Sequence, residues 1–449
     1  MKTKLFLILM LATFISQAQI ISSTDAAVLF SGNEHYGTAR FEALGGAFGA
    51  LGGDMSAGDI NPAGLGIFLD NRFSVSLGYR KTNINTSFFG NNLHNNDEFL
   101  NVSQAGGALV FRVNNNSNWR HVTLGFNYSI INDFSYSFIM EGNSGTPDFL
   151  DDPFLNQDNN PSNDVFYNNV DGQSFINTTG GINDKFTFSV AANYNDKIYY
   201  GLSLATYNLD YNQVADLAES NNDGAGNTLD ASLIQALQTS GSGFSINLGI
   251  IARPTNTLRL GLSYQSPIWY NLTDLYSDDL QINVSNASVP FTDNTSGVFD
   301  YRLTTPSTLT GSFAYLFGKM GLISFDYTYK DYQSTKLRPT ADFVPENQDL
   351  SNGLRGTSQY RVGAEWRFEM LSIRGGYFYE QNPYKDSFNS DNLTGYSFGL
   401  GFNLGNLTKI DVAYTNTSNT QPYKFLQASG PGNLDIENNR ITATVVIGF

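Results

Sequence analysis

Three histidines, His35, His94 and His121, are the first candidates for metal or acid–base chemistry in this sequence, which contains no cysteine. They form neither an HExxH motif nor a pair at metal-ligand spacing. No GxSxG motif marks a nucleophilic serine. A serine and a histidine brought together only by the fold, as in a phospholipase, remain the alternative. We expect no catalytic residues and no enzyme.

Carboxylates gather in one polar stretch, where Asp148, Asp151 and Asp152 follow one another closely. Oxygen ligands of this type suit Ca²⁺. The simpler interpretation is a group of solvated acids in a loop. We therefore predict no metal and no cofactor.

Glycine and alanine crowd the stretch GALGGDMSAGDINPAGLG, from Gly49 to Gly66. A phosphate-binding loop would follow a strand and open a βαβ unit, and neither is present here. Paired glycines interrupt short helical turns, and Asn61-Pro62-Ala63 marks a turn. We interpret the stretch as a compact plug that precedes the first strand.

The first eighteen residues have the pattern of a secretory signal peptide. Lys2 and Lys4 precede an apolar run from Leu5 to Ile15, and small residues lead to Ala18. The run is too short to span a bilayer, so a membrane anchor is the weaker alternative. We predict export of the chain, with cleavage near Ala18.

The composition places the rest of the chain in a membrane. Charged residues make up 15% and aromatic residues 14%, and the net charge is −16. A net negative charge argues against nucleic acid as a partner, because a basic surface is needed there. An exported chain that is rich in aromatic rings and poor in charge needs a non-aqueous surface for those rings.

Alternation with a period of two dominates after residue 71. Tyr360, Val362 and Trp366 fall on one face of a predicted strand, and Arg361 and Glu365 fall on the other. The apolar face carries rings and the other face carries small polar residues, which is typical of a membrane barrel with a wet lumen. A β-sandwich is the alternative. We predict an all-β chain, an antiparallel transmembrane β-barrel.

Short turns alternate with long polar connections, and this predicts fourteen strands with the short turns in the periplasm. The long connections are expected at 91–100, 143–182, 215–240, 284–297, 338–355, 383–393 and 419–438. The strands are expected at 72–90, 101–113, 119–142, 184–195, 198–214, 242–253, 258–283, 298–317, 321–337, 356–368, 371–382, 394–404, 407–418 and 439–449.

The last strand, ITATVVIGF, alternates and ends the chain on Phe449. A terminal aromatic strand resembles the signal that the outer-membrane insertion machinery reads. We therefore predict the outer membrane of a Gram-negative bacterium as the location, with membrane lipid and that machinery as partners.

The residues Gly45-Gly46-Ala47-Phe48, Ala50, Asp54 and Ser56-Ala57, followed closely by Asn61-Pro62-Ala63-Gly64-Leu65, form a motif that resembles the FadL/TodX family of outer-membrane transporters for hydrophobic compounds. The resemblance implies a signal peptide at 1–18, a hatch at 19–70 inside the lumen, and a fourteen-stranded barrel at 71–449. The implied hatch motif comprises Gly45, Gly46, Phe48, Asn61, Pro62, Ala63, Gly64 and Leu65. We expect Asn61 to hydrogen-bond the turn and Pro62 to fix it.

The family also implies passive transport of a small hydrophobic molecule, such as a long-chain fatty acid or an aromatic compound. Capture would use apolar residues of the outer loops, and a pocket would lie above the hatch. Packing of these residues against each other, or of the hatch against the wall, is the alternative for each. The candidates are Phe149, Phe154, Phe166, Leu229, Leu233 and Leu237 in the loops, with the three leucines on one helical face, and Phe48, Leu51, Leu65 and Phe68 in the hatch.

A lateral exit through the third strand is the last implied feature. Asn132 falls on the lipid-facing phase of that strand, with Asp133 beside it. A polar group facing hydrocarbon is costly, and a bulge would turn it away and open the wall. The alternative places Asn132 at the outer rim, among the headgroups. Pro267 and Pro306 suggest further bulges.

Two other functions remain open at this point. A PorV-like relative would use its loops to hold protein partners in secretion, and such a partner is unknown. A haem receptor would need axial ligands, which three scattered histidines do not supply.

Overall fold

The computed structural model describes residues 21–113, 117–156, 163–405 and 407–449. The predicted signal peptide lies outside the described residues. Within the described ranges, no helix is long and apolar enough to cross a membrane.

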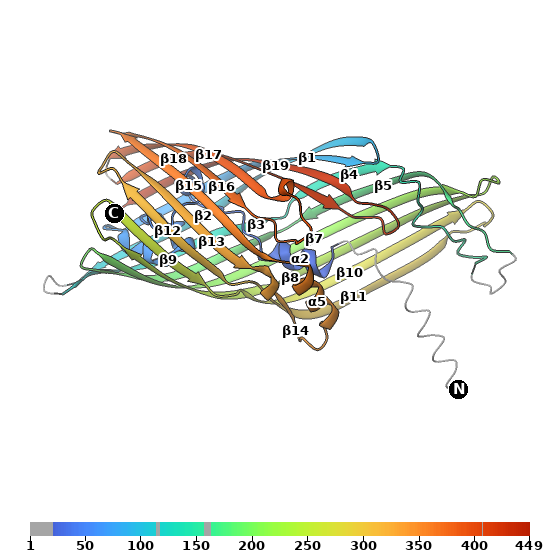
Figure 1. The fold of residues 1–449 in the computed structure, drawn as a ribbon, viewed down its shortest axis with the longest axis horizontal. Coiled ribbons are helices and arrows are strands. Elements are labelled where there is room, and N and C mark those ends of the chain that lie inside the picture. Colours follow the sequence, from blue (N-terminus) through green and yellow to red (C-terminus); the bar gives the residue numbers. More distant parts are fainter. Residues whose placement is uncertain (1–20, 114–116, 157–162, 406) are drawn as a thin grey trace.

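The described strands form one closed antiparallel wall (Figure 1). β1 (Arg72–Phe88) pairs with β2 (Asn91–Arg112) on one side and with the last strand, β19 (Gly432–Gly448), on the other, which closes the barrel. The intervening strands are β3 (Trp119–Asp133), β4 (Tyr136–Gly142), β5 (Asn169–Gly180), β6 (Ile182–Tyr194), β7 (Ile198–Asn222), β8 (Thr228–Ala252), β9 (Leu258–Gln265), β10 (Trp269–Val284), β11 (Phe291–Thr304), β12 (Thr308–Leu316), β13 (Gly321–Asp331), β14 (Lys336–Arg338), β15 (Gly356–Phe368), β16 (Leu371–Glu380), β17 (Leu393–Gly405) and β18 (Thr408–Tyr423).

Five wall strands are interrupted and consist of two segments each: β3 with β4, β5 with β6, β9 with β10, β11 with β12, and β13 with β14. Counted in this way, the nineteen segments make fourteen wall strands, and the predicted fold class is confirmed. Outside the wall strands, the predicted outer connections contain α5 (Val344–Gly353) and η3 (Asn389–Asp391), and η2 (Tyr332–Ser334) joins β13 to β14.

The two faces of the wall have opposite chemistry. On β15, Tyr360, Val362 and Trp366 are each more than 40% exposed, whereas Arg361 and Glu365 are buried on the lumen side. The outer surface is therefore an apolar band for lipid, and the lumen is polar at this level. The alternation read from the sequence is present strand by strand.

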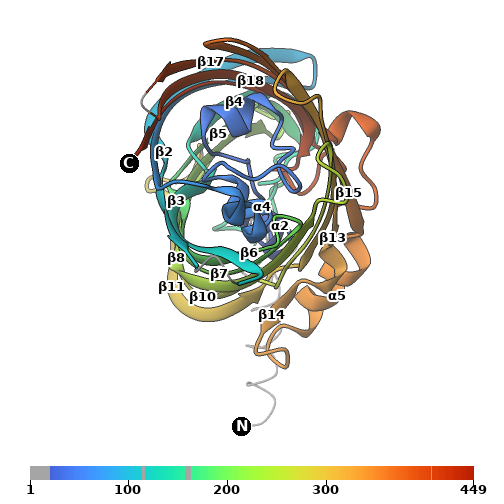
Figure 2. The same cartoon turned by 90° about the vertical axis from the view of Figure 1, so that its left-hand side faces the viewer.

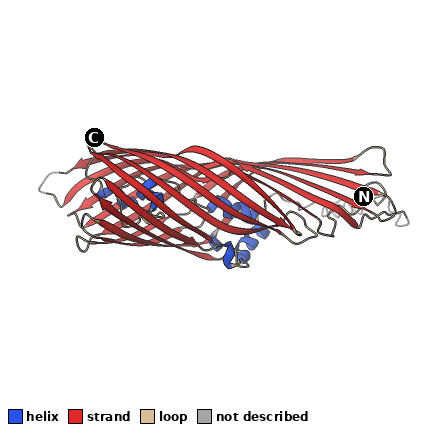
Figure 3. Ribbon diagram, turned by 90° about the horizontal axis from the view of Figure 1, so that it is seen from above, coloured by secondary structure: helices blue, strands red, loops and turns tan. Residues whose placement is uncertain are grey.

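Five of the predicted outer loops were wrong in extent, because long strands occupy much of the sequence that was assigned to them (Figure 3). β7 and β8 each have 25 residues, more than twice the length that a bilayer requires. Above the membrane the outer face needs no apolar residues, so the alternation fades although pairing continues. Four connections lie at 89–90, 223–227, 285–290 and 424–431, in place of 91–100, 215–240, 284–297 and 419–438. In the fifth case, β5 begins at Asn169, inside the loop predicted at 143–182.

Two prolines bend neighbouring wall strands without opening the wall. Pro267 separates β9 from β10, and Pro306 separates β11 from β12. Where the backbone ladder is interrupted, side-chain hydroxyls accept hydrogen bonds from backbone N–H groups. Ile268 N donates to Thr305 Oγ1 at 2.9 Å, and Ile246 N donates to Ser266 Oγ at 2.9 Å. The sequence suggested bulges at the two prolines. The structure shows interrupted strands there, and the hydroxyl hydrogen bonds seal both interruptions.

The seal at Pro306 predicts a measurable loss in the variant Thr305→Val. Valine keeps the shape of the side chain but leaves the buried Ile268 N–H without its acceptor. We expect the free energy of unfolding to fall by about 1–3 kcal/mol in denaturant titrations of the barrel in lipid vesicles. The exposed Thr295→Val is the control, and an equal effect of the two variants would contradict the assigned role of Thr305.

Candidate functional site

The chain from residue 21 to residue 71 lies inside the barrel (Figure 2). It forms α2 (Ser23–Ser31), α3 (Ala39–Ala43), α4 (Ala57–Ile60) and the 3-10 helix η1 (Pro62–Ile67). α3 contacts β16–β19, and η1 contacts β3 and β6–β8. We call this segment the hatch. It bridges the lumen from one wall to the other.

Paired glycines end α3. Gly45 and Gly46 have φ of +61° and +73°, a left-handed conformation that side chains with a Cβ disfavour. A Cβ on Gly45 would also lie 3.1 Å from the backbone nitrogen of Tyr377 in the wall. The paired glycines therefore let the hatch reverse direction in contact with the barrel.

The Asn-Pro-Ala turn is held by hydrogen bonds at its first residue. Asn61 Oδ1 accepts from Ala63 N at 3.1 Å, and Asn61 Nδ2 donates to Gly49 O at 2.7 Å and to Ile250 O in the wall at 3.2 Å. Pro62 occupies the first position of η1, where its fixed φ suits the helix. The hydrogen bond predicted for Asn61 is present.

Wall glycines receive this turn. A Cβ on Gly249 would lie 1.9 Å from Asn61 Oδ1, and one on Gly201 would lie 2.1 Å from Ala63 N. The turn therefore approaches the wall more closely than a residue with a Cβ at position 249 or 201 would permit. The hatch motif and the wall are complementary surfaces.

Four hatch residues that the sequence suggested for a pocket pack against the wall. Phe48 and Leu51 form a buried cluster with Phe41, Leu44, Ala314 and Leu322. Leu65 and Phe68 form another with Met55, Ala108 and Ala191. Their observed contacts therefore correspond to the packing alternative.

Ion pairs join the hatch to the wall at several heights. Glu42 accepts from Arg440 Nε at 3.1 Å and from Thr442 Oγ1 at 2.7 Å. Asp59 pairs with Lys185 at 2.9 Å and also accepts from Asn127 Nδ2 at 3.0 Å. Pairs that lie this deep fix position more than they stabilise, since desolvation offsets the attraction.

From α2 of the hatch outward, apolar clusters inside the barrel follow one another along β8. Leu229 belongs to an outermost cluster with Tyr167 and Ile282, and Leu233 belongs to the next with Phe138 and Phe175. Leu237 packs on a third cluster, around Phe30 of α2, and Ile251 contacts the hatch at Ala63. An apolar column therefore runs down the inside of the barrel.

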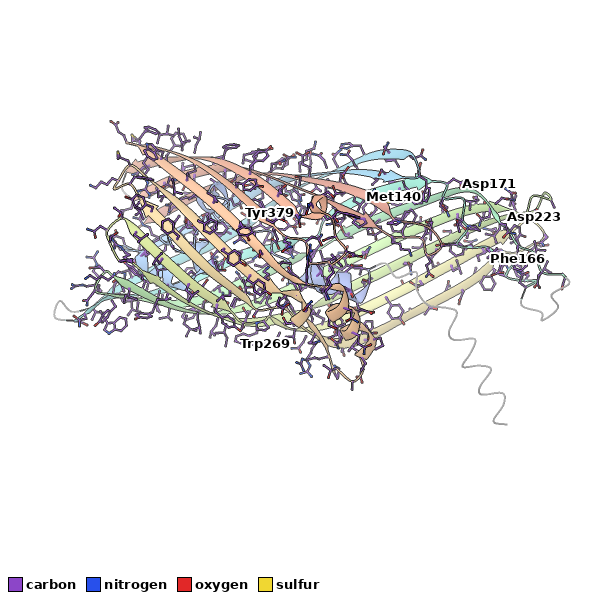
Figure 4. The ribbon with its side chains drawn as sticks, viewed as in Figure 1. Met140, Phe166, Asp171, Asp223, Trp269 and Tyr379 are labelled. Carbon is purple, nitrogen blue, oxygen red and sulfur yellow. The ribbon has the colours of Figure 1, made fainter. Side chains whose placement is uncertain are left out.

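The sequence pattern predicted the three leucines on one face of a helix. They lie instead on one face of the strand β8. A spacing of four residues fits a helix turn and is also a multiple of the strand period, so the pattern alone could not separate the two. Of the loop aromatics, Phe149 packs on the two outer clusters, whereas Phe154 and Phe166 are 41% and 44% exposed. Figure 4 shows Phe166 near the outer end of the molecule, beyond Trp269.

The third cluster is rich in aromatic rings, and it was not predicted from the sequence. Phe30 contacts Phe134 and Tyr211 edge-on, with ring centroids 6.0 and 5.6 Å apart, and Tyr207 contacts Tyr270. A signal was present on β7: Leu202 and Leu204 face outward, whereas Tyr207, Leu209 and Tyr211 of the other phase are buried. The apolar face changes sides where the strand leaves the membrane.

The third wall strand breaks its pairing at the predicted bulge. Its register with β6 shifts between Ile130 and Asn132, and its ladder with β2 runs only from Gln104↔Ser129 to Arg112↔His121. Asn132 is 4% exposed and points inward, where Nδ2 donates to Leu29 O at 3.1 Å and to Gly32 O at 3.3 Å. Asp133 Oδ1 pairs with Arg80 at 3.4 Å. Neither residue faces lipid or the rim.

The family model described as "Outer membrane protein transport protein (OMPP1/FadL/TodX)" matches residues 19–428. This chain belongs to the FadL/TodX family. The family consists of outer-membrane β-barrels that transport hydrophobic compounds, so the chain is a transporter and not an enzyme.

Solved structures share this fold at low sequence identity. A Pseudomonas aeruginosa FadL homologue has 14% identity and a TM-score of 0.59, with 93% of this chain and 99% of that chain covered. The P. putida toluene transporter TodX has the same four values. The Ralstonia pickettii toluene transporter TbuX has 18% identity and a TM-score of 0.52, with 91% and 97% covered. No curated protein sequence matched the chain.

Within this FadL/TodX barrel, the acidic loop residues serve as loop ties. Asp148 accepts from Gln427 N at 2.8 Å and Ala428 N at 2.7 Å, which joins two outer connections. Asp152 accepts from Phe154 N at 2.9 Å and Leu155 N at 3.1 Å. The described residues contain no group of three or more ligands for a metal ion.

The histidines lie far apart in the fold and each bonds a different partner. His94 Nδ1 bonds Asn85 Oδ1 at 2.8 Å, and His121 Nε2 bonds Gly66 O at 2.8 Å. His35, in the hatch, accepts a hydrogen bond from Arg361 through Nε2. Burial lowers the pKa of His35 well below its usual value, and the charges of Arg361, Lys330, Arg440 and Lys185 lower it further.

The fit between Gly249 and Asn61 gives a direct test of hatch seating. In Gly249→Ala, the added methyl occupies the position of Asn61 Oδ1, so the turn must move. We expect about 1–3 kcal/mol of destabilisation and faster hydrogen–deuterium exchange in the hatch, with little change in the wall. Gly311→Ala is the matched control, because a Cβ there has no neighbour within 4 Å. Unchanged hatch exchange in Gly249→Ala would contradict the assigned fit.

The neutral state of His35 makes hatch seating sensitive to acid. Unfolded chains protonate histidine near pH 6.5, whereas the folded protein resists protonation, so the free energy of unfolding falls as the pH drops below 6.5. We expect His35→Asn, which tolerates the positive φ of this residue, to flatten that fall in thermal unfolding between pH 8 and pH 5. Burial raises the pKa of Asp54, so this group makes the folded protein more stable as the pH falls. The effect is the same in the wild type and in His35→Asn, and it cancels when the two are compared. If stability changed with pH in the same way in the wild type and in His35→Asn, His35 would not contribute to the acid sensitivity.

Proposed function

We propose that this protein carries a small hydrophobic molecule passively across the outer membrane. The molecule is captured among the outer loops, held in the apolar column above the hatch, and released sideways through the wall between β2 and β4. Structural relatives are named toluene transporters and a monoaromatic hydrocarbon channel, which supports an aromatic or fatty acid-like cargo. Apolar burial, at about 25 cal/mol per Å², would supply the binding energy.

The observation that carries this proposal is that the apolar column meets the break in the wall. Ile131 and Phe134, at the break, belong to the aromatic cluster around Phe30. Phe138 and Met140, on β4, belong to the cluster above it. A cargo in the column is therefore in contact with the strand segments beside the break.

The break lies at a suitable height for release into lipid. Leu100 of β2 is 71% exposed and pairs with Tyr79 of β1, close to the outer edge of the apolar band. The ladder between β2 and β3 ends at Gln104↔Ser129, just below this level. A molecule leaving there would enter the outer part of the bilayer.

Side chains, rather than a backbone ladder, bridge the gap between β2 and β4. Asp97 accepts from Ser137 N at 2.6 Å, and Asn91 Nδ2 donates to Glu141 O at 3.0 Å. A neutral bond of this kind contributes about 0.5–1.5 kcal/mol, and a charge-assisted bond, such as that from Arg80 Nη2 to Ser135 O at 2.6 Å, contributes about 1.5–3 kcal/mol. The gap can therefore widen at lower cost than a seam with a continuous ladder. The hatch below it obstructs the axial route, which favours a lateral one.

The docking alternative raised by the sequence has less support. That alternative would use the outer loops, but most of the connection predicted at 215–240 is strand, and its residues Leu229 and Leu233 are buried inside the barrel. Each described histidine has a partner and lies apart from the others, which gives haem no axial pair.

A reversible lock across the gap tests the lateral route. The chain contains no cysteine, so the double variant Asp97→Cys/Ser137→Cys introduces one possible disulfide. We expect oxidised cells that carry this variant to lose protein-dependent uptake of radiolabelled toluene and of a radiolabelled long-chain fatty acid, and to regain it on reduction.

The control is Thr394→Cys/Ser418→Cys, whose hydroxyls lie 3.4 Å apart across the laddered β17–β18 seam. Its uptake should not change on oxidation. If the Asp97–Ser137 lock forms and uptake continues at the wild-type rate, the lateral exit is wrong. If the wild type takes up neither compound, the proposed cargo class is wrong.

A further inference from the structure

A polar cavity lies at the short-turn end of the barrel, between α3 of the hatch and the wall strands β15–β18. Its volume is ≈ 220 Å³, room for a small molecule or for the end of a larger one. Short turns face the periplasm in barrels of this type, so the cavity lies on the periplasmic side. It is separate from the apolar column, whose clusters share no residue with its lining.

Paired charges form the floor of the cavity. Glu365, 1% exposed, accepts from Arg40 Nε at 2.8 Å, from Arg374 Nε at 2.7 Å and from Arg367 Nη2 at 2.5 Å. Arg374 also reaches Asp411 at 2.5 Å. Three guanidinium groups thus converge on one buried carboxylate. These ion pairs fix the positions of the guanidinium N–H donors.

Positive charge is in excess at this cavity. Its lining includes four cationic side chains and three carboxylates, although the chain as a whole carries −16. Lys409, an exposed residue of β18, takes part in none of the ion pairs among the described residues. The seven charged groups are Arg40, Arg367, Arg374, Lys409, Glu365, Glu369 and Asp411.

An apolar molecule gains nothing from such a lining, because its entry would strip water from charges without replacing it. An oxyanion gains charge-assisted hydrogen bonds, and guanidinium groups match its planar or tetrahedral oxygens. We propose that this cavity binds an oxyanion, a carboxylate or a phosphate, with Lys409 and Arg367 as the principal donors. The oxyanion comes either from a free periplasmic anion or from the head group of an amphiphile.

Calorimetry on the full chain in nanodiscs of zwitterionic lipid tests the proposal. The probes are decanoate, its uncharged analogue decanol, acetate and inorganic phosphate. We expect at least one of the three anions to bind, and Lys409→Gln and Arg367→Gln each to weaken that binding by about 10- to 100-fold, the range for a lost charge-assisted bond. Lys319→Gln, in the short turn between β12 and β13 and outside the cavity lining, is the matched control and should bind as the wild type does.

The pattern among probes identifies the source of the anion. Binding of acetate or phosphate that depends on Lys409 supports the proposal and indicates a free anion. Binding of decanoate alone, with the same dependence, supports it and indicates a head group. Decanoate binding that survives both substitutions, or that decanol matches, places the ligand in the apolar column and overturns this proposal while leaving the transport proposal intact. Absence of binding by all three anions also overturns it, and circular dichroism of each variant confirms that the barrel is folded.

Discussion

In hydrocarbon, every backbone N–H and C=O must find a partner inside the protein, and the rest of this structure depends on that constraint. It explains why the first and last strands pair, and why Ser266 and Thr305 supply hydroxyls where two prolines interrupt the ladder. It also makes the β2–β4 gap unusual. There the wall relies on side chains, and the bulge turns Asn132 inward onto the hatch, where its amide is satisfied.

A wall of fourteen strands encloses a lumen wide enough to require a filling, and the hatch supplies it with small residues. Glycines on both surfaces let backbone approach backbone, as at Gly261 of the wall and Gly49 of the hatch. Buried ion pairs then specify one placement of the hatch among the many that small residues would allow. From the hatch outward, the inner face of the wall thus changes from polar to apolar. Over the same length, the outer face of the same strands changes from apolar to polar.

Much of the fold could be predicted because the wall repeats one simple pattern. Alternation on strands such as 356–368 is imposed by lipid on one side and a polar lumen on the other, and both environments leave their mark on the sequence. The alternation is absent where a strand extends beyond the bilayer, because lipid no longer contacts its outer face. Residues 91–100 are strand, yet both of their faces are largely exposed, so composition there resembles a loop.

The candidate site was harder to predict, since its parts come together only in three dimensions. Asn61 and the hatch glycines were visible because their turn chemistry is local. Tyr207, Tyr211 and Tyr270 meet Phe30 and Phe134 across the lumen, and no spacing in the chain reports that contact. The same holds for Glu365, whose three arginine partners come from α3, β15 and β16.

The partners of α3 on the last strand have a consequence for biogenesis. Ala39 N donates to Thr444 Oγ1 at 2.7 Å, and Glu42 is held by Arg440 and Thr442, all on β19, the strand that completes the wall against β1. Until β19 docks, the hatch lacks these three anchors. The hatch can therefore reach its final, fully anchored position only when β19 completes the wall, so the last step of barrel closure also supplies the last attachments of the hatch.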